Sequence, residues 1–128
     1  SALAEGIYKI IFSAFPGGEK KQLQALADHC IEMLQRQPIE LEPGVVLLHD
    51  RIENIAYPLV CFGAQKKGYR LSALEAPVQI IVLILVPVHQ SAEEHLRFLA
   101  EVATLFRAHR LKQRLIDANE PEDLLSYQ

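Results

Sequence analysis

Two histidines stand where the sequence could support chemistry. His49 follows the apolar run Val45-Val46-Leu47-Leu48, and a second apolar run, Tyr57 to Phe62, follows after a short polar stretch. A histidine at the exit of a strand, just before a loop, is held by rigid backbone and stays open to solvent. An imidazole ionises near neutral pH, so this placement suits a nucleophile. The alternative is a polar residue at a strand end with no chemical role.

The second histidine, His95, lies in a segment that predicts the start of a helix. Ser91 and Glu94 form the Ser-x-x-Glu pattern of a capping box directly after the most apolar stretch of the chain. The positive end of a helix dipole favours an anion by about 0.3 to 1 kcal/mol at an exposed site. If the fold brings His49 and His95 together beside this helix, the two rings and the helix N-terminus form a phosphate site.

The other histidines have weaker contexts. His29 lies beside the apolar stripe of a predicted helix and is assigned no role. His89 follows the most apolar stretch, and its loop position could bring it to the same rim as His49. His109 is surrounded by basic residues and is interpreted as part of a solvated helix end. We expect no metal site, because the cysteines lack metal-ligand spacing and no His-Glu-x-x-His motif occurs.

Composition limits the classes of protein that fit. The chain has 128 residues, half of them hydrophobic and 23% charged, which favours one compact globular domain over disorder. The formal net charge is -3 and no basic stripe is present, so nucleic acid is not an expected partner. Cys30 and Cys61 lie in apolar segments and are expected to be reduced core thiols, with a disulfide as the alternative.

No segment is expected to cross a membrane. The longest apolar run, Val78 to Val86, is far shorter than the ~20 residues that a transmembrane helix needs, and no signal-peptide pattern is present. We therefore expect a cytoplasmic location. Ser1-Ala2 is typical of residues left by cloning, so the chain could also be the soluble part of a longer inner-membrane protein.

Periodicity predicts alternating helices and strands. Four segments have helical patterns or caps: Leu3–Phe15, Glu19–Gln37, a helix after Ser91 with Leu96, Leu99, Ala103 and Phe106 as its buried stripe, and a helix around Leu111–Ile116. Strands are predicted at Val45–Leu48, Tyr57–Gly63 and Pro77–Pro87, with a turn at Lys66–Gly68 before a short edge strand, Tyr69–Leu71. A last short helix is predicted to start at Glu120-Pro121. The nearly unbroken apolar strand should be covered on both faces.

Several of these segments, taken in order, resemble one known family. They are Leu48-His49-Asp50-Arg51, the loop and strand from Ile52 to Val60, Gly68–Leu71 with Pro77–Pro87, Glu94-His95-Leu96, and Leu124-Leu125. Together they resemble the enzyme IIA domains of the fructose, mannitol and nitrogen-regulatory type, from the bacterial sugar phosphotransferase system. In that family an apolar strand ends in a phosphoacceptor histidine, usually preceded by proline and followed by a small residue.

The resemblance implies an α/β fold for residues 1–128, with a mixed sheet of four to five strands flanked by helices and a C-terminal helix at Leu124-Leu125. It implies that His49 takes a phosphoryl group from the histidine phosphocarrier protein and passes it to a cysteine of a transporter B domain. His95 would bind the imidazole or the phosphate. Arg51 is a further candidate for stabilising the phosphate, and the family's phosphate-directed arginine would correspond to Arg36. No cofactor or metal is implied.

Three departures from the family pattern leave a second reading open. Leu48 replaces the proline, the loop before Gly44 is short, and Asp50 replaces the small residue. A carboxylate about 4 Å from a phosphate would cost roughly 1 kcal/mol in water and ~4 kcal/mol if partly buried, unless it points away or pairs with Arg51. The alternative function is therefore a non-catalytic regulatory domain attached to a membrane transporter such as a cation exchanger. No Gly-x-Ser-x-Gly or His-Glu-x-x-His motif supports an unrelated hydrolase.

Overall fold

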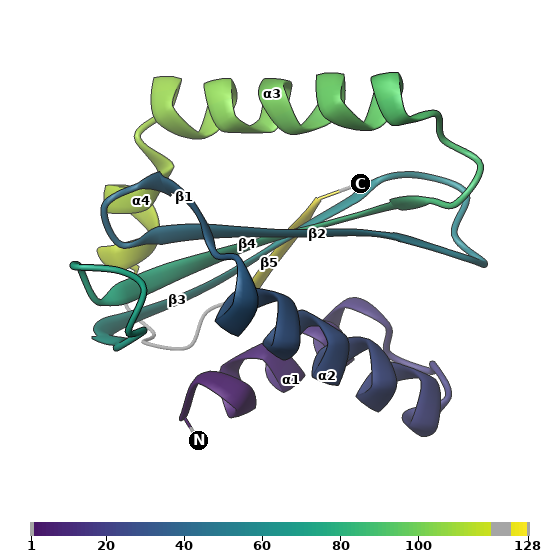
Figure 1. Cartoon of the computed structure of the whole chain (residues 1–128), viewed down its shortest axis with the longest axis horizontal. Helices are drawn as coiled ribbons and strands as arrows, with labels where there is room; N and C mark the ends of the chain where they lie inside the picture. Colours follow the sequence, from purple (N-terminus) through teal and green to yellow (C-terminus); the bar gives the residue numbers. More distant parts are fainter. Residues whose placement is uncertain (1, 119–123, 128) are drawn as a thin grey trace.

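A computed structural model describes residues 2–118 and 124–127. Within these residues the chain forms four helices and five strands (Figure 1). They are α1 (Ala2–Ala14), α2 (Lys20–Arg36), β1 (Ile39–Glu42), β2 (Val45–Ile52), β3 (Leu59–Tyr69), β4 (Val78–Pro87), α3 (Ala92–Ala108), α4 (Leu111–Ile116) and β5 (Leu124–Tyr127). None of the described helices is both long enough and apolar enough to cross a bilayer.

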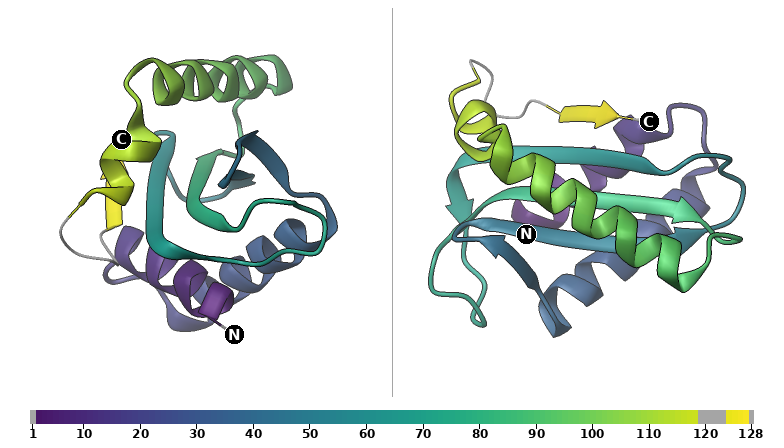
Figure 2. Two further views of the ribbon diagram at one scale, coloured as in Figure 1. Left: turned by 90° about the vertical axis from the view of Figure 1, so that its left-hand side faces the viewer. Right: turned by 90° about the horizontal axis from the view of Figure 1, so that it is seen from above.

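The strands form one mixed sheet in the order β1-β2-β4-β3-β5. The central pair, β2 and β4, is parallel, and the remaining pairs are antiparallel. Helices α1 and α2 cover one face and α3 crosses the other, as the two further views show (Figure 2). The predicted α/β class and the mixed sheet of four to five strands are confirmed. So is the expectation that the apolar strand, β4, is covered on both faces.

Alternation along β2 divides its side chains between two cores. Val46 and Leu48 pack in the cluster under α1 and α2. Val45 and Leu47 pack in the cluster under α3 and α4, where Phe106 is 1% exposed. Continuing the alternation places His49 and Arg51 on the α3 side, and Asp50 on the α2 side.

The strand that carries His49 is longer than predicted. β2 continues to Ile52, and His49 pairs in register with Ile84 of β4, so it lies inside the strand and not at its exit. β1, which the sequence analysis missed, pairs with β2 across a tight turn at Gly44, whose φ is +85°. The polar residues after Leu48 gave no signal for a strand, because only the neighbouring β4 supplies the hydrogen bonds that extend it.

The predicted turn at Lys66–Gly68 and the edge strand at Tyr69–Leu71 are wrong. β3 runs without interruption to Tyr69, which pairs with Val78, and its register with β4 shifts between Ala64 and Tyr69. Gly68 adopts a φ of +75° in this irregular stretch. Both a β-bulge and a tight turn can require a glycine with a positive φ. A glycine in the sequence therefore does not distinguish between them.

The predicted C-terminal helix is wrong where the structure can test it. Residues 119–123, which include the predicted start at Glu120-Pro121, lie outside the described residues. Leu124–Tyr127 form β5, which pairs antiparallel with β3. A short apolar run fits a helix or a strand equally well by pattern, and here it supplies backbone partners for the otherwise open edge of β3.

The predicted positions of the four described helices are confirmed. The predicted buried face of α3 needs one correction. Leu96 is 66% exposed, whereas His95 is 8% exposed and takes the inward place. Cys30 and Cys61 are both buried and form no disulfide within the described residues, as expected. Burial, together with the charge of Asp50, raises the pKa of the Cys30 thiol to about 12, so that thiol stays protonated.

Phe106 anchors α3 to the sheet, and its burial should contribute strongly to the stability of the folded protein. Its ring lies 5.9 Å from that of Phe62. We expect Phe106→Ala to lower the free energy of unfolding by about 3 to 5 kcal/mol in urea denaturation, because it leaves a cavity in the core. Leu105→Ala, at the exposed neighbouring position, should cost less than about 0.5 kcal/mol. Equal losses for the two variants would contradict this packing.

Candidate functional site

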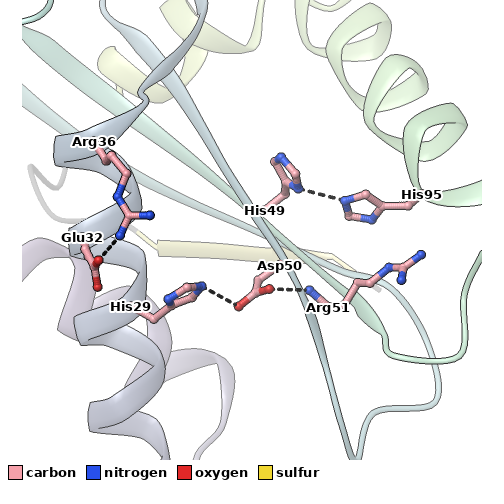
Figure 3. Close-up of polar contacts among 7 residues, drawn as sticks. All are labelled: His29, Glu32, Arg36, His49, Asp50, Arg51 and His95. Atoms are coloured by element: carbon pink, nitrogen blue, oxygen red, sulfur yellow. Dashed lines mark hydrogen bonds and ion pairs between the residues drawn. The ribbon is translucent and has the colours of Figure 1, made fainter. Parts of the chain in front are cut away.

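The fold brings His49 and His95 together. Nδ1 of His49 lies 2.8 Å from Nε2 of His95, and the ring centroids are 4.9 Å apart with 47° between the ring planes (Figure 3). His49 comes from β2 and His95 from the second turn of α3. The two rings therefore meet, as the predicted phosphate site requires.

The connection between β4 and α3 positions this pair. β4 ends at Pro87, in register with Ile52 at the end of the parallel strand β2. The chain then turns, and Ser91 caps α3 by accepting a hydrogen bond from the backbone N–H of Glu94 at 3.1 Å. The predicted cap at Ser91 is confirmed. Because the carboxyl ends of parallel strands share one edge of a sheet, α3 begins beside the carboxyl-terminal half of β2, which carries His49.

The hydrogen bond between the rings uses Nδ1 of His49 and leaves its other ring nitrogen, Nε2, outside the contact. A neutral imidazole has one N–H and one lone pair. If Nδ1–H of His49 donates to Nε2 of His95, the lone pair of His49 is on Nε2, the ring atom not used in this contact. Nε2 is then the ring atom able to act as a nucleophile, and the contact with His95 favours that tautomer of His49.

The surroundings of His95 favour its neutral form. Burial lowers its pKa below the ordinary value of 6.5, and the neighbouring His49 and the Arg51 guanidinium lower it further, whereas the carboxylate of Asp50 acts in the opposite direction. A neutral His95 has a lone pair with which to accept from His49. Its other ring nitrogen, Nδ1, is buried and has no hydrogen-bond partner among the described residues.

Asp50 points away from the histidine pair. Its Oδ2 lies 3.3 Å from Nε2 of His29 on α2, and its Oδ1 accepts from the backbone N–H of Arg51 at 2.8 Å (Figure 3). The carboxylate therefore does not lie on the face where a phosphate would bind. His29, to which the sequence analysis assigned no role, is its partner. Successive side chains of a strand point to opposite faces, so the sequence could have shown that Asp50 faces away from His49.

The two candidate arginines have different surroundings. Arg51 follows His49 by two positions in β2, on the same face, and its charge reaches His95. Arg36 lies in the last turn of α2, on the other side of the sheet, and pairs with Glu32 (Figure 3). The structure brings Arg51 to the histidine pair and does not bring Arg36 there.

The two other histidines that the sequence offered, His89 and His109, are both exposed. His89 lies in the loop after β4, and His109 lies at the C-terminal end of α3. In the described ranges, no group of three or more His, Cys, Asp or Glu side chains has an arrangement that could hold a metal ion.

Comparison with known proteins identifies one family. The family model described as "Phosphoenolpyruvate-dependent sugar phosphotransferase system, EIIA 2" matches residues 7–127. This span includes every strand of the sheet and both histidines of the pair. No curated protein matches the sequence.

The charges around His95 should move its pKa in opposite directions. We expect Arg51→Met to raise the pKa of His95, because it removes a positive charge, and Asp50→Asn to lower it, because it removes a negative one. NMR titration of the imidazole signals measures both shifts. Lys112→Met removes a positive charge near Pro43 instead and should leave His95 unchanged. Shifts of the same sign for Arg51→Met and Asp50→Asn would contradict the arrangement.

Proposed function

The chain belongs to the EIIA 2 family of the phosphoenolpyruvate-dependent sugar phosphotransferase system, and we propose that it carries a phosphoryl group transiently on Nε2 of His49. The hydrogen bond between Nδ1 of His49 and Nε2 of His95 supports this proposal most strongly. With His49 as the donor, this bond leaves a lone pair on Nε2 of His49, a half-buried residue within β2.

The transfer exchanges one N–P bond for another. The lone pair on Nε2 of His49 attacks the phosphorus of the donor phosphohistidine as the donor's N–P bond breaks, and the bonding electrons return to the donor ring. Positive charge develops on the His49 ring as the new bond forms. The Nδ1–H bond to the neutral His95 stabilises that charge. The reverse sequence passes the phosphoryl group from His49 to a cysteine thiolate.

Two groups are suited to the negative charge of the phosphoryl oxygens. Arg51 lies on the same face as His49, and α3 begins beside His95 with the positive end of its dipole. Glu93, in the first turn of α3, forms an ion pair with Arg97 at 3.0 Å, which offsets part of its own charge. Phosphoryl transfer depends mainly on such positioning and electrostatics, so these residues suffice without a cofactor in the proposal.

The proposed partners follow from the family. The donor is the histidine phosphocarrier protein, and the acceptor is a transporter B domain or a regulated transporter, with the exchange taking place in the cytoplasm. Both partners must reach His49. Val88 and Leu96, which flank the connection to α3, are 51% and 66% exposed and offer apolar surface for such contacts.

One observation favours a second candidate function. Arg36, the expected counterpart of the family's phosphate-directed arginine, is paired with Glu32 on the opposite side of the sheet. A site without that arginine suits a non-catalytic EIIA-like domain that regulates a membrane transporter such as a cation exchanger. Such a domain would bind its partner and take up no phosphoryl group.

Phosphoryl uptake tests the first function against the second. We expect incubation with phosphoenolpyruvate, the phosphocarrier protein and its upstream enzyme to add one acid-labile phosphoryl group per chain, measured by intact mass. His49→Ala should abolish uptake, and His95→Ala should slow it about tenfold or more, because the nucleophile loses its hydrogen-bond partner.

His29→Ala is the matched control, because His29 lies on the opposite face and contacts Asp50. Its rate of uptake should equal that of the wild type. Failure of the wild type to take up phosphate from every cognate carrier would reject phosphotransfer and leave the regulatory function.

A further inference from the structure

Two buried side-chain atoms at the start of α3 lack hydrogen-bond partners. They are Nδ1 of His95 and Oε1 of Gln90, and they are the two such atoms found in the described part of the chain. Buried polar groups in folded proteins almost always have a partner. One of these atoms is an amide oxygen, which accepts, and the other is a ring nitrogen, which donates when it carries the proton.

The helix cap fixes where these two residues stand relative to the start of α3. Ser91 is the N-cap of α3, so Gln90 is the residue before the cap, and His95 is the fourth helical residue. Side chains at these two positions commonly meet across the first turn of a helix. The cap geometry is intact, since the backbone N–H of His95 donates to the carbonyl of Ser91 at 2.9 Å.

The chemistry of the histidine pair requires a proton on Nδ1 of His95. For Nε2 of His49 to hold a lone pair, its Nδ1–H must donate to Nε2 of His95. A neutral His95 then carries its own proton on Nδ1, which needs an acceptor inside the protein. In the opposite tautomer, His95 would donate to His49, and the proton of neutral His49 would occupy Nε2 and block attack.

We propose that Gln90 is a positioning residue whose Oε1 accepts the Nδ1–H of His95, after a rotation of its amide or through one bridging water. This inference rests on the proposed phosphotransfer at His49. The three side chains then form a row of hydrogen bonds, from the Gln90 carbonyl through His95 to His49. A side chain from just before the helix cap thereby sets which nitrogen of His49 is nucleophilic.

The tautomer of His95 tests the contact directly. In long-range ¹H–¹⁵N NMR spectra of the unphosphorylated protein, we expect the wild type to show His95 protonated on Nδ1. Gln90→Leu should shift His95 toward the Nε2–H form and lower the rate of phosphoryl uptake about 10- to 100-fold. Gln90→Glu, which retains an acceptor oxygen, should keep the Nδ1–H form.

Gln113→Leu, at an exposed position of α4, is the matched control and should change neither measurement. Backbone amide spectra establish that each variant is folded. An Nε2–H tautomer in the wild type, or a tautomer or uptake rate unchanged in Gln90→Leu, would overturn the proposal. Absence of uptake in the wild type contradicts the proposed function instead, and the ring nitrogens of His95 still decide whether Gln90 makes the contact.

Discussion

The hydrogen bond between Nδ1 of His49 and Nε2 of His95 links two elements that are distant in the sequence, β2 and α3. Each neutral ring has one proton to donate, so the direction of this bond determines which nitrogen of His49 is free to react. The bond needs α3 to pass close over the end of β2. That position depends on the parallel pairing of β2 with β4 and on the packing of Phe106. The site is thus a product of the sheet topology and of one helix anchor.

Alternation along β2 separates two kinds of polar residue that are adjacent in the chain. His49 faces α3, while Asp50 faces α2 and contacts His29. A carboxylate beside a phosphate would be repulsive, whereas on the far face Asp50 acts on His95 as the last of four influences on its pKa. The sequence left open whether Asp50 points away from the phosphate, and the alternation of side chains along β2 shows that it does. The expected contribution of Arg36 is not recovered, because α2, which carries it, lies on the other side of the sheet.

The sequence predicted the large elements because their apolar patterns are long and their ends are marked by Pro16, Pro38 and Ser91. It also identified the two histidines that meet. It failed where tertiary contacts decide: β2 extends through polar residues because β4 is beside it, and Leu124–Tyr127 pair with β3 instead of forming a helix. The contact of His29 with Asp50 and the proposed role of Gln90 were missed for a similar reason. The sequence alone does not show that His29 faces Asp50 of β2, nor that Gln90 lies just before the N-cap of α3.

The most direct test of this account is to identify the ring nitrogen of His49 that carries the phosphoryl group. In ³¹P and ¹⁵N NMR spectra of the phosphorylated protein, coupling of phosphorus to Nε2 is the expected result, because Nδ1 is engaged with His95. Attachment to Nδ1 would require the hydrogen bond between the rings to break, and it would contradict the proposed role of His95 in selecting the nucleophilic nitrogen.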